Sequence, residues 1–302
     1  MAVPISRPSF SELTQPDLFR VFIETGQQAP VEFSSIFNVI TMPYNPVTDF
    51  QISGLGTLPS KGMGQQFDLD EPITGGTKEY LAAPFGLAIE FHWEAWRDEL
   101  YGTFQEMVAE LRRASDNRLE VDAHSILNNA ESGSFPGFDG VSLINTAHPR
   151  LDGGPDIANR PDTDINFSFT FVQAAMQHFH NLVDERGLPR LMAPTMAIVT
   201  PEFYHDASEI LGSTGRPLTA NNEANALLQD ELRWMISHYL TNPNKSFIMT
   251  RQGVHDLNFF VRDAPMFDMF DDQRTKNAVA TVYQRHTAGF GTYRGVFGSV
   301  GE

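Results

Sequence analysis

His148 has the most motif-like setting of any histidine in the chain, within Asn145-Thr146-Ala147-His148-Pro149. A histidine in such a loop can act as a general base in a hydrolase when a nucleophile and an orienting acid lie beside it. No serine or acid is obviously placed for either role. We therefore expect a loop histidine hydrogen-bonded to the backbone. A soluble hydrolase using His148 remains open as the least favoured function.

Metal chemistry finds little support in the other polar residues. His178 and His180 flank Phe179, and on a helix they point about 200° apart, so they cannot share a metal ion. Three acidic clusters lack the spacing, glycine and terminal glutamate of a calcium loop, and we expect them to be solvated: Asp68/Asp70/Glu71, Asp162/Asp164 and Asp268/Asp271/Asp272. We expect no catalytic, cofactor-binding or metal-binding residues.

The familiar sequence motifs of enzymes are missing. There is no HExxH, no phosphate loop, no nucleophile elbow and no GxGxxG, since Gly54-Leu55-Gly56 runs into Thr-Leu-Pro. Cysteine is absent, which excludes disulfides, thiolate metal sites and cysteine nucleophiles. The sequence therefore predicts a protein without enzymatic activity.

Composition narrows the class of protein further. The 302 residues are 41% apolar and carry a net charge of −17, from 21 basic and 38 acidic side chains. Such a chain can bury a core, and its negative surface repels phosphate backbones, which argues against a basic nucleic-acid-binding face. The longest apolar stretch, 81–91, is broken by Pro84 and Gly86, so we expect no membrane span.

The first third of the sequence reads as appendages. Residues 1–49 form a proline-punctuated arm with one helical pattern at 15–25 and a second apolar stretch at 33–40. Residues 50–91 read as a long two-stranded excursion, with a turn-rich tip at 59–64 and a returning strand from Lys78 onward. These apolar residues are too scattered for a core of their own. We expect them to bury against the rest of the chain or a neighbour.

The remainder reads as a mixed α and β body. Apolar residues at three- and four-residue spacing predict a long spine helix over 93–130, which includes Trp93 and Trp96. Gly187 is expected to cap a helix that runs through 174–183. The other expected elements are a short strand at 141–146, a strand at 197–199, a helix starting at Thr200-Pro201, a helix over Asn221 to Tyr239, strands at 247–249, 257–261 and 277–290, and a closing strand within 289–298.

The order of these elements resembles the major capsid protein of tailed bacteriophages, most closely the Mu-like major head subunit group, whose fold also occurs in encapsulin shells. Four segments carry the resemblance: Asp17-Leu18-Phe19 with Val21-Phe22, Lys78-Glu79-Tyr80 through Trp96-Arg97-Asp98, Leu143-Ile144-Asn145-Thr146-Ala147-His148-Pro149, and Tyr293-Arg294-Gly295-Val296-Phe297-Gly298.

The resemblance implies an α+β capsid fold with five parts. These are an N-terminal arm (1–49), an extended β-hairpin loop (50–91), a peripheral domain with the spine helix (92–160), an axial α/β domain (161–265) and closing strands of the peripheral domain (266–302). It also implies hexameric and pentameric capsomers that form an icosahedral shell around phage double-stranded DNA, which is contacted weakly and without specificity.

Further expectations follow from the same resemblance. Scaffolding, portal and decoration proteins are the implied partners, and the implied location is the virion capsid, assembled in the host cytoplasm. Some capsids of the family link a loop lysine covalently to a neighbour's asparagine. Lys61 and Lys78 lie in the corresponding region, where we expect ordinary solvent-facing lysines. An encapsulin-type nanocompartment shell remains the main alternative.

Overall fold

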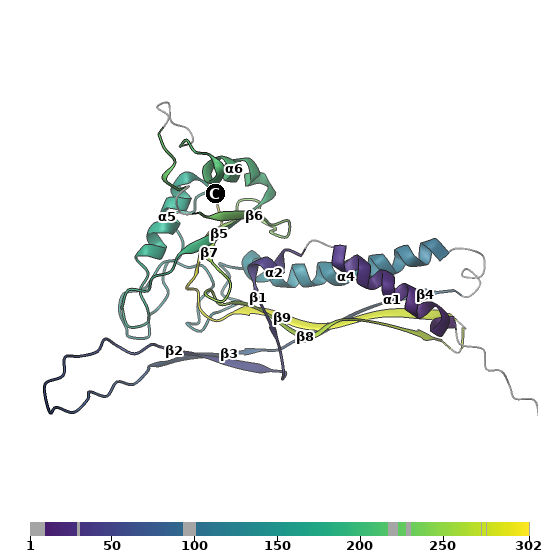
Figure 1. Ribbon diagram of the computed structural model, residues 1–302, viewed down its shortest axis with the longest axis horizontal. Coiled ribbons are helices and arrows are strands. Elements are labelled where there is room, and N and C mark those ends of the chain that lie inside the picture. Colours follow the sequence, from purple (N-terminus) through teal and green to yellow (C-terminus); the bar gives the residue numbers. More distant parts are fainter. Residues whose placement is uncertain are drawn as a thin grey trace, which may run out of the picture.

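The computed structural model describes residues 10–28, 31–92, 101–216, 223–227, 231–272, 274–275 and 277–301. It is an α+β structure, as expected, with three sheets, a long helix and a projecting loop (Figure 1). Residues 93–100, the expected start of the spine helix with Trp93 and Trp96, lie outside the described residues.

A long four-stranded sheet forms the base of the body, in the order β1-β8-β9-β4. β1 runs parallel to β8, and the other pairs are antiparallel. The strands are β1 (Asn38–Thr41), β4 (Ala83–Phe91), β8 (Leu257–Asp271) and β9 (Ala278–Phe290). One face of this sheet carries the helices α4 (Tyr101–Asn128) and α1 (Phe10–Gln28) (Figure 1).

The spine helix α4 contributes to two separate hydrophobic cores. Its first half places Phe104, Val108 and Leu111 in a core with Leu18 and Phe22 of α1 and Phe267 of β8. Its second half places Leu119, Ala123, Ile126 and Leu127 in a core with Phe37, Phe247, Phe259 and Phe290. The arm helix α1 is therefore buried against its own chain. From the sequence, the arm is expected to bury against either the rest of the chain or a neighbour. For residues 15–28 the structure shows burial against the rest of the chain.

A second sheet, in the order β10-β7-β5-β6, forms the other lobe. Its strands are β5 (Pro194–Val199), β6 (Arg233–Ile236), β7 (Ser246–Thr250) and β10 (Val296–Ser299). The helices α5 (Phe169–His180) and α6 (Tyr204–Gly212), the latter preceded by the 3-10 turn η1 (Pro201–Phe203), share a core with this sheet. Ser168 caps α5 by accepting a hydrogen bond from the Phe171 backbone N–H.

The strands of the two lobes do not follow the expected domain borders. β8 continues through residue 265, and β10, which was expected to close the peripheral part, pairs with β7 of the other sheet. The five-part division by residue number accordingly stays a proposal.

The extended loop is a hairpin that is shorter than expected. β2 (Val47–Ile52) pairs antiparallel with β3 (Thr74–Tyr80), and residues 53–73, called here the distal loop, form no strand. The expected returning strand divides, because residues 83–91 leave the hairpin as β4 and pair with β9. Figure 1 shows the distal loop projecting from the body at the end opposite α1.

Three local predictions were wrong. In the expected helix 221–239, residues 233–236 instead form β6, which pairs parallel with β5. The helix before Gly187 ends at His180, and the left-handed Gly187 (φ 77°) lies in a separate turn. No strand forms at 141–146, where Ile144 donates its backbone N–H to the Ala130 carbonyl instead. In addition, residues 33–36 form the short helix α2 (Phe33–Ile36).

Candidate assembly surfaces

The distal loop exposes large apolar side chains without a core beneath them. Leu58 and Leu69 are 98% and 97% exposed, and Leu55, Met63 and Phe67 are also exposed. Its two arms are joined by three hydrogen bonds: Ser53 N–H donates to the Ile73 carbonyl at 2.9 Å, Ile73 N–H donates to Ser53 Oγ at 2.8 Å, and Gly56 N–H donates to Asp70 Oδ2 at 2.7 Å. Apolar surface of this kind is stabilised only when another surface covers it.

The base of the extended loop, by contrast, is fixed to the body. A Cβ atom at Gly76 would lie 2.0 Å from the Phe138 carbonyl oxygen, so β3 passes directly over that backbone. Lys78 Nζ donates hydrogen bonds to the carbonyls of Pro136 (2.7 Å) and Phe290 (2.8 Å). Burial lowers the pKa of Lys78 to about 8.

The two lysines considered for cross-linking therefore differ. Lys78 is a structural anchor, so the expectation of a solvent-facing lysine was wrong for it. Lys61 lies at the tip of the distal loop, with its Nζ 3.9 Å from the centre of the Phe67 ring. The ammonium of Lys61 remains exposed.

A second apolar surface lies on the long sheet. Phe267 and Met269 of β8 point toward α1 and α4, so the alternate residues Met266 and Phe270 point to the opposite face. There they are joined by Tyr283, which lies opposite Met266 in the register, and all three are 40–51% exposed. We call this set the sheet face.

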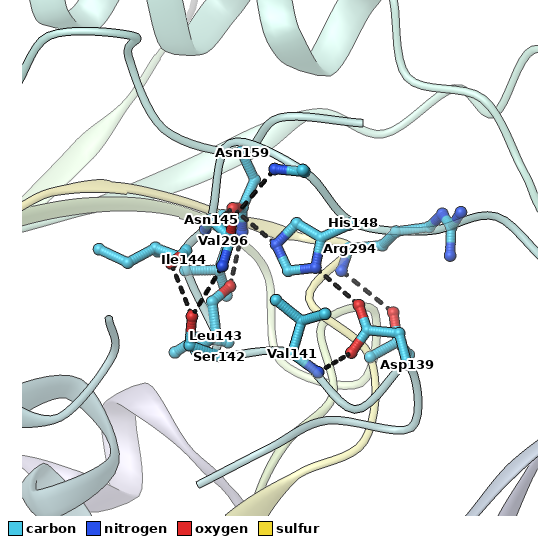
Figure 2. A network of polar contacts seen from close by, with 12 residues as sticks. Asp139, Val141, Ser142, Leu143, Ile144, Asn145, His148, Asn159, Arg294 and Val296 are labelled. Carbon is cyan, nitrogen blue, oxygen red and sulfur yellow. Dashed lines mark hydrogen bonds and ion pairs between the residues drawn. The ribbon is translucent and has the colours of Figure 1, made fainter. Parts of the chain in front are cut away.

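His148 lies in a buried polar network and not on a surface (Figure 2). Its Nδ1 is 2.6 Å from Asp139 Oδ2, and its Nε2 is 3.0 Å from Asn159 Oδ1. That amide oxygen also accepts the Asn145 N–H, so Nε2 must carry a proton and donate it.

The same network ties together segments that are distant in sequence. Asn159 Nδ2 donates to the carbonyls of Leu143 (2.7 Å) and Val296 (3.1 Å), and the His148 ring stacks on Tyr293 with centroids 3.6 Å apart. The contact between His148 and Asp139 was not predicted from the sequence. Among the described residues no serine hydroxyl is hydrogen-bonded to His148, so the arrangement joins the 139–159 loop to β10 and forms no catalytic triad.

The remaining candidate residues do not form a site. His178 is partly buried on α5 and His180 is exposed, and within the described part of the chain no group of three His, Asp or Glu side chains could hold a metal ion. Asp70 of the first acidic cluster is hydrogen-bonded to Arg186, at 2.8 Å from each carboxylate oxygen. That contact was not foreseen from the sequence.

Buried histidines predict acid sensitivity. Burial lowers the pKa values of His178 and His255 to about 4, from an ordinary value of 6.5. The folded state resists protonation of both, so stability is fully present above pH 6.5 and falls as the pH drops toward 4. Glu120 acts in the opposite sense, because burial raises its pKa to about 7 and folding then favours its protonated form between pH 7 and 4.5.

We expect the two histidines to outweigh the glutamate, so that the free energy of unfolding falls between pH 6.5 and 4. Urea unfolding of dissociated subunits across this range measures it. His255→Asn should flatten the slope, whereas His180→Asn, which alters an exposed ring, should leave it unchanged. Equal slopes for the wild type and His255→Asn would contradict the assignment.

Comparison with known proteins agrees with this picture. A family model described as phage capsid protein matches residues 76–298, which is most of the chain. The chain belongs to the phage capsid protein family. No curated protein matches the sequence.

Solved structures show the same fold. The procapsid protein of bacteriophage JBD30 gives a TM-score of 0.55 at 14% identity, over 98% of this chain and 77% of that one. The virus-like particle from Pyrococcus furiosus gives a TM-score of 0.55 at 9% identity, over 94% of this chain and 98% of that one. A structure from Mycobacterium phage Adephagia gives a TM-score of 0.54 at 10% identity, over 99% of this chain and 95% of that one. The predicted tailed-phage major capsid fold is confirmed.

The family and the fold together assign this capsid protein a structural role as a major capsid subunit in the virion, within a homo-oligomeric shell. Among the described residues, no helix has the length and apolar composition required to cross a membrane.

Proposed function

We propose that this capsid protein assembles, without enzymatic activity, as hexamers and pentamers into an icosahedral shell around phage double-stranded DNA. Assembly takes place in the host cytoplasm, with scaffolding, portal and decoration proteins as further partners. The observation that carries the proposal is the distal loop, which exposes five large apolar side chains over a stretch that forms no strand and belongs to no hydrophobic core of the described residues.

The proposed contact joins the two apolar surfaces described above. A distal loop about 20 residues long can reach well beyond its own body, because an extended chain spans about 3.3 Å per residue. We propose that it lies across the sheet face of the adjacent subunit, covering Met266, Phe270 and Tyr283. Covering one large apolar side chain contributes about 1.5–3 kcal/mol, and the contact repeats around each capsomer.

The net charge supports DNA as the content of the shell. At −17 the protein repels DNA on average, which suits a container in which the packaged molecule must slide. An encapsulin-type compartment is the second candidate, favoured by the similarity to the Pyrococcus furiosus particle. Nuclease-protected DNA in particles from infected cells favours the phage capsid, whereas a protein cargo favours the compartment.

Substitution of the sheet face tests the proposed contact. Met266→Asp places a charge on this face, so we expect loss of shells in negative-stain images and sedimentation profiles, with the subunit still folded by circular dichroism. Met107→Asp is the matched control, because Met107 is similarly exposed (42% against 51%) but lies on α4. Normal shells from Met266→Asp would contradict the contact, and a stable monomer of the wild type would contradict the function.

A further inference from the structure

A tight turn at residues 183–189 faces the extended loop. Val183 and Pro189 form a backbone bridge, and Gly187 takes a left-handed conformation. Asp184 Oδ1 accepts the backbone N–H groups of Arg186 (2.8 Å) and Leu188 (2.9 Å), which makes the turn rigid. The two side chains at its tip, Glu185 and Arg186, both reach the extended loop.

Glu185 makes a buried anchor at the base of that loop. Its Oε1 accepts a hydrogen bond from Gln51 Nε2 of β2 at 2.5 Å and is also paired with Arg294 Nη1. Its Oε2 accepts the Leu151 N–H at 3.2 Å. Glu185 and Arg294 are 8% and 3% exposed, so water and salt have little access to this anchor.

Arg186 makes a second contact, farther out and open to solvent. Its Nη1 lies 2.8 Å from both carboxylate oxygens of Asp70, and its Nη2 donates to the Glu71 carbonyl. Asp70 Oδ2 also accepts the Gly56 N–H, so one carboxylate joins both arms of the distal loop to the turn. The Asp70 side chain is 45% exposed, and salt can screen the pair.

We propose that Arg186 and Asp70 are positioning residues for assembly: they hold the distal loop in the pose in which the neighbouring subunit receives it. The inference rests on the proposed function, since the neighbour is a second copy of this chain. Between the buried anchor at Gln51 and the pair at Asp70, the two arms are joined where Ile52 pairs with Thr74 and by two hydrogen bonds between Ser53 and Ile73. Loss of the Asp70–Arg186 pair therefore frees the loop beyond residue 53 while its base stays fixed.

A loop held in its binding pose loses less conformational freedom on association than a free one. Asp70→Asn and Arg186→Gln are therefore expected to slow shell formation about two- to fivefold, the scale of an exposed ion pair, without changing subunit stability. In 1 M salt the wild type should slow toward the variants, while the variants change less. Asp68→Asn is the matched control, because Asp68 is an exposed acid two residues away on the same loop.

Distance measurement tests the pose without assembly. The chain has no cysteine, so spin labels at Ser60→Cys and His180→Cys, both exposed residues, occupy unique positions. We expect a narrow distance distribution in free wild-type subunits, a broad one in Asp70→Asn and Arg186→Gln, and no further broadening in the double variant.

Unchanged distributions in both variants would overturn the proposal, and so would broadened distributions with unchanged assembly rates. Failure of the wild type to form any shell would instead remove the proposed function. In that case the spin-label distances in free subunits still decide whether the pair positions the loop.

Discussion

Deleting residues 57–69 and joining Gly56 to Asp70 through a Gly-Ser linker should abolish shells while the subunit remains folded. The deleted residues are exposed almost throughout and belong to none of the hydrophobic cores, so their loss removes no buried contact from the body. We expect the thermal midpoint of the free subunit to shift by less than about 2 °C. Calorimetry and sedimentation velocity measure the two effects separately.

A full-length control separates the length of the loop from its apolar side chains. Replacing Leu58, Met63 and Phe67 by serine keeps the chain length and removes most of the apolar surface at the tip. If the apolar contact drives assembly, this variant should fail as the deletion does. Shells of normal size from the deletion variant would show that the loop has no role in holding subunits together.

His148→Ala should destabilise the subunit by about 3 kcal/mol, because His148 is buried in the polar network that joins the 139–159 loop to β10. The substitution leaves the Asp139 carboxylate and the Asn159 amide oxygen without their ring partner in a buried site, and it opens a cavity against Tyr293. Urea unfolding of free subunits measures the loss. His180→Ala is the control, since that ring is exposed on α5, and it should stay within about 0.5 kcal/mol of the wild type. An equally small effect at His148 would contradict the structural role.

Elements with a strong local pattern could be predicted from the sequence. The expected helix at 15–25 and the expected strands at 197–199, 247–249 and 257–261 lie within observed elements. The expected spine helix and the expected strand at 277–290 match α4 and β9 to within two residues at the ends that the structure describes. In each, apolar periodicity and β-branched or aromatic content favour the same structure, so local preference and packing agree.

The wrong predictions occur where distant pairing decides the structure. Residues 233–236 carry Trp, Met and Ile, a short apolar run that fits a helix or a strand equally well, and pairing with β5 selects the strand. Residues 83–91 look like the second half of a hairpin, but β9 takes them as its partner. Local secondary-structure propensity does not determine which strands pair with each other.

The polar contacts were the least predictable part. Asp139 and His148 are nine residues apart, and Asp70 and Arg186 are 116 apart, and neither spacing follows a known motif. Such contacts depend on loops whose paths are set by the body around them. The order of the elements, and not any single residue, carried the resemblance to phage capsids.

The placement of α4 in two cores has a mechanical consequence. A helix anchored at both halves to the same long sheet acts as a beam, and bending it requires disrupting well-packed side chains in either core. If the subunit occupies both five-fold and six-fold positions, as proposed, α4 and the long sheet should keep the same shape in both. The difference in curvature is then accommodated at the contacts between subunits. We expect the shell to be stiff within each subunit and compliant at the contacts between subunits, so that under load these contacts deform before the subunits do.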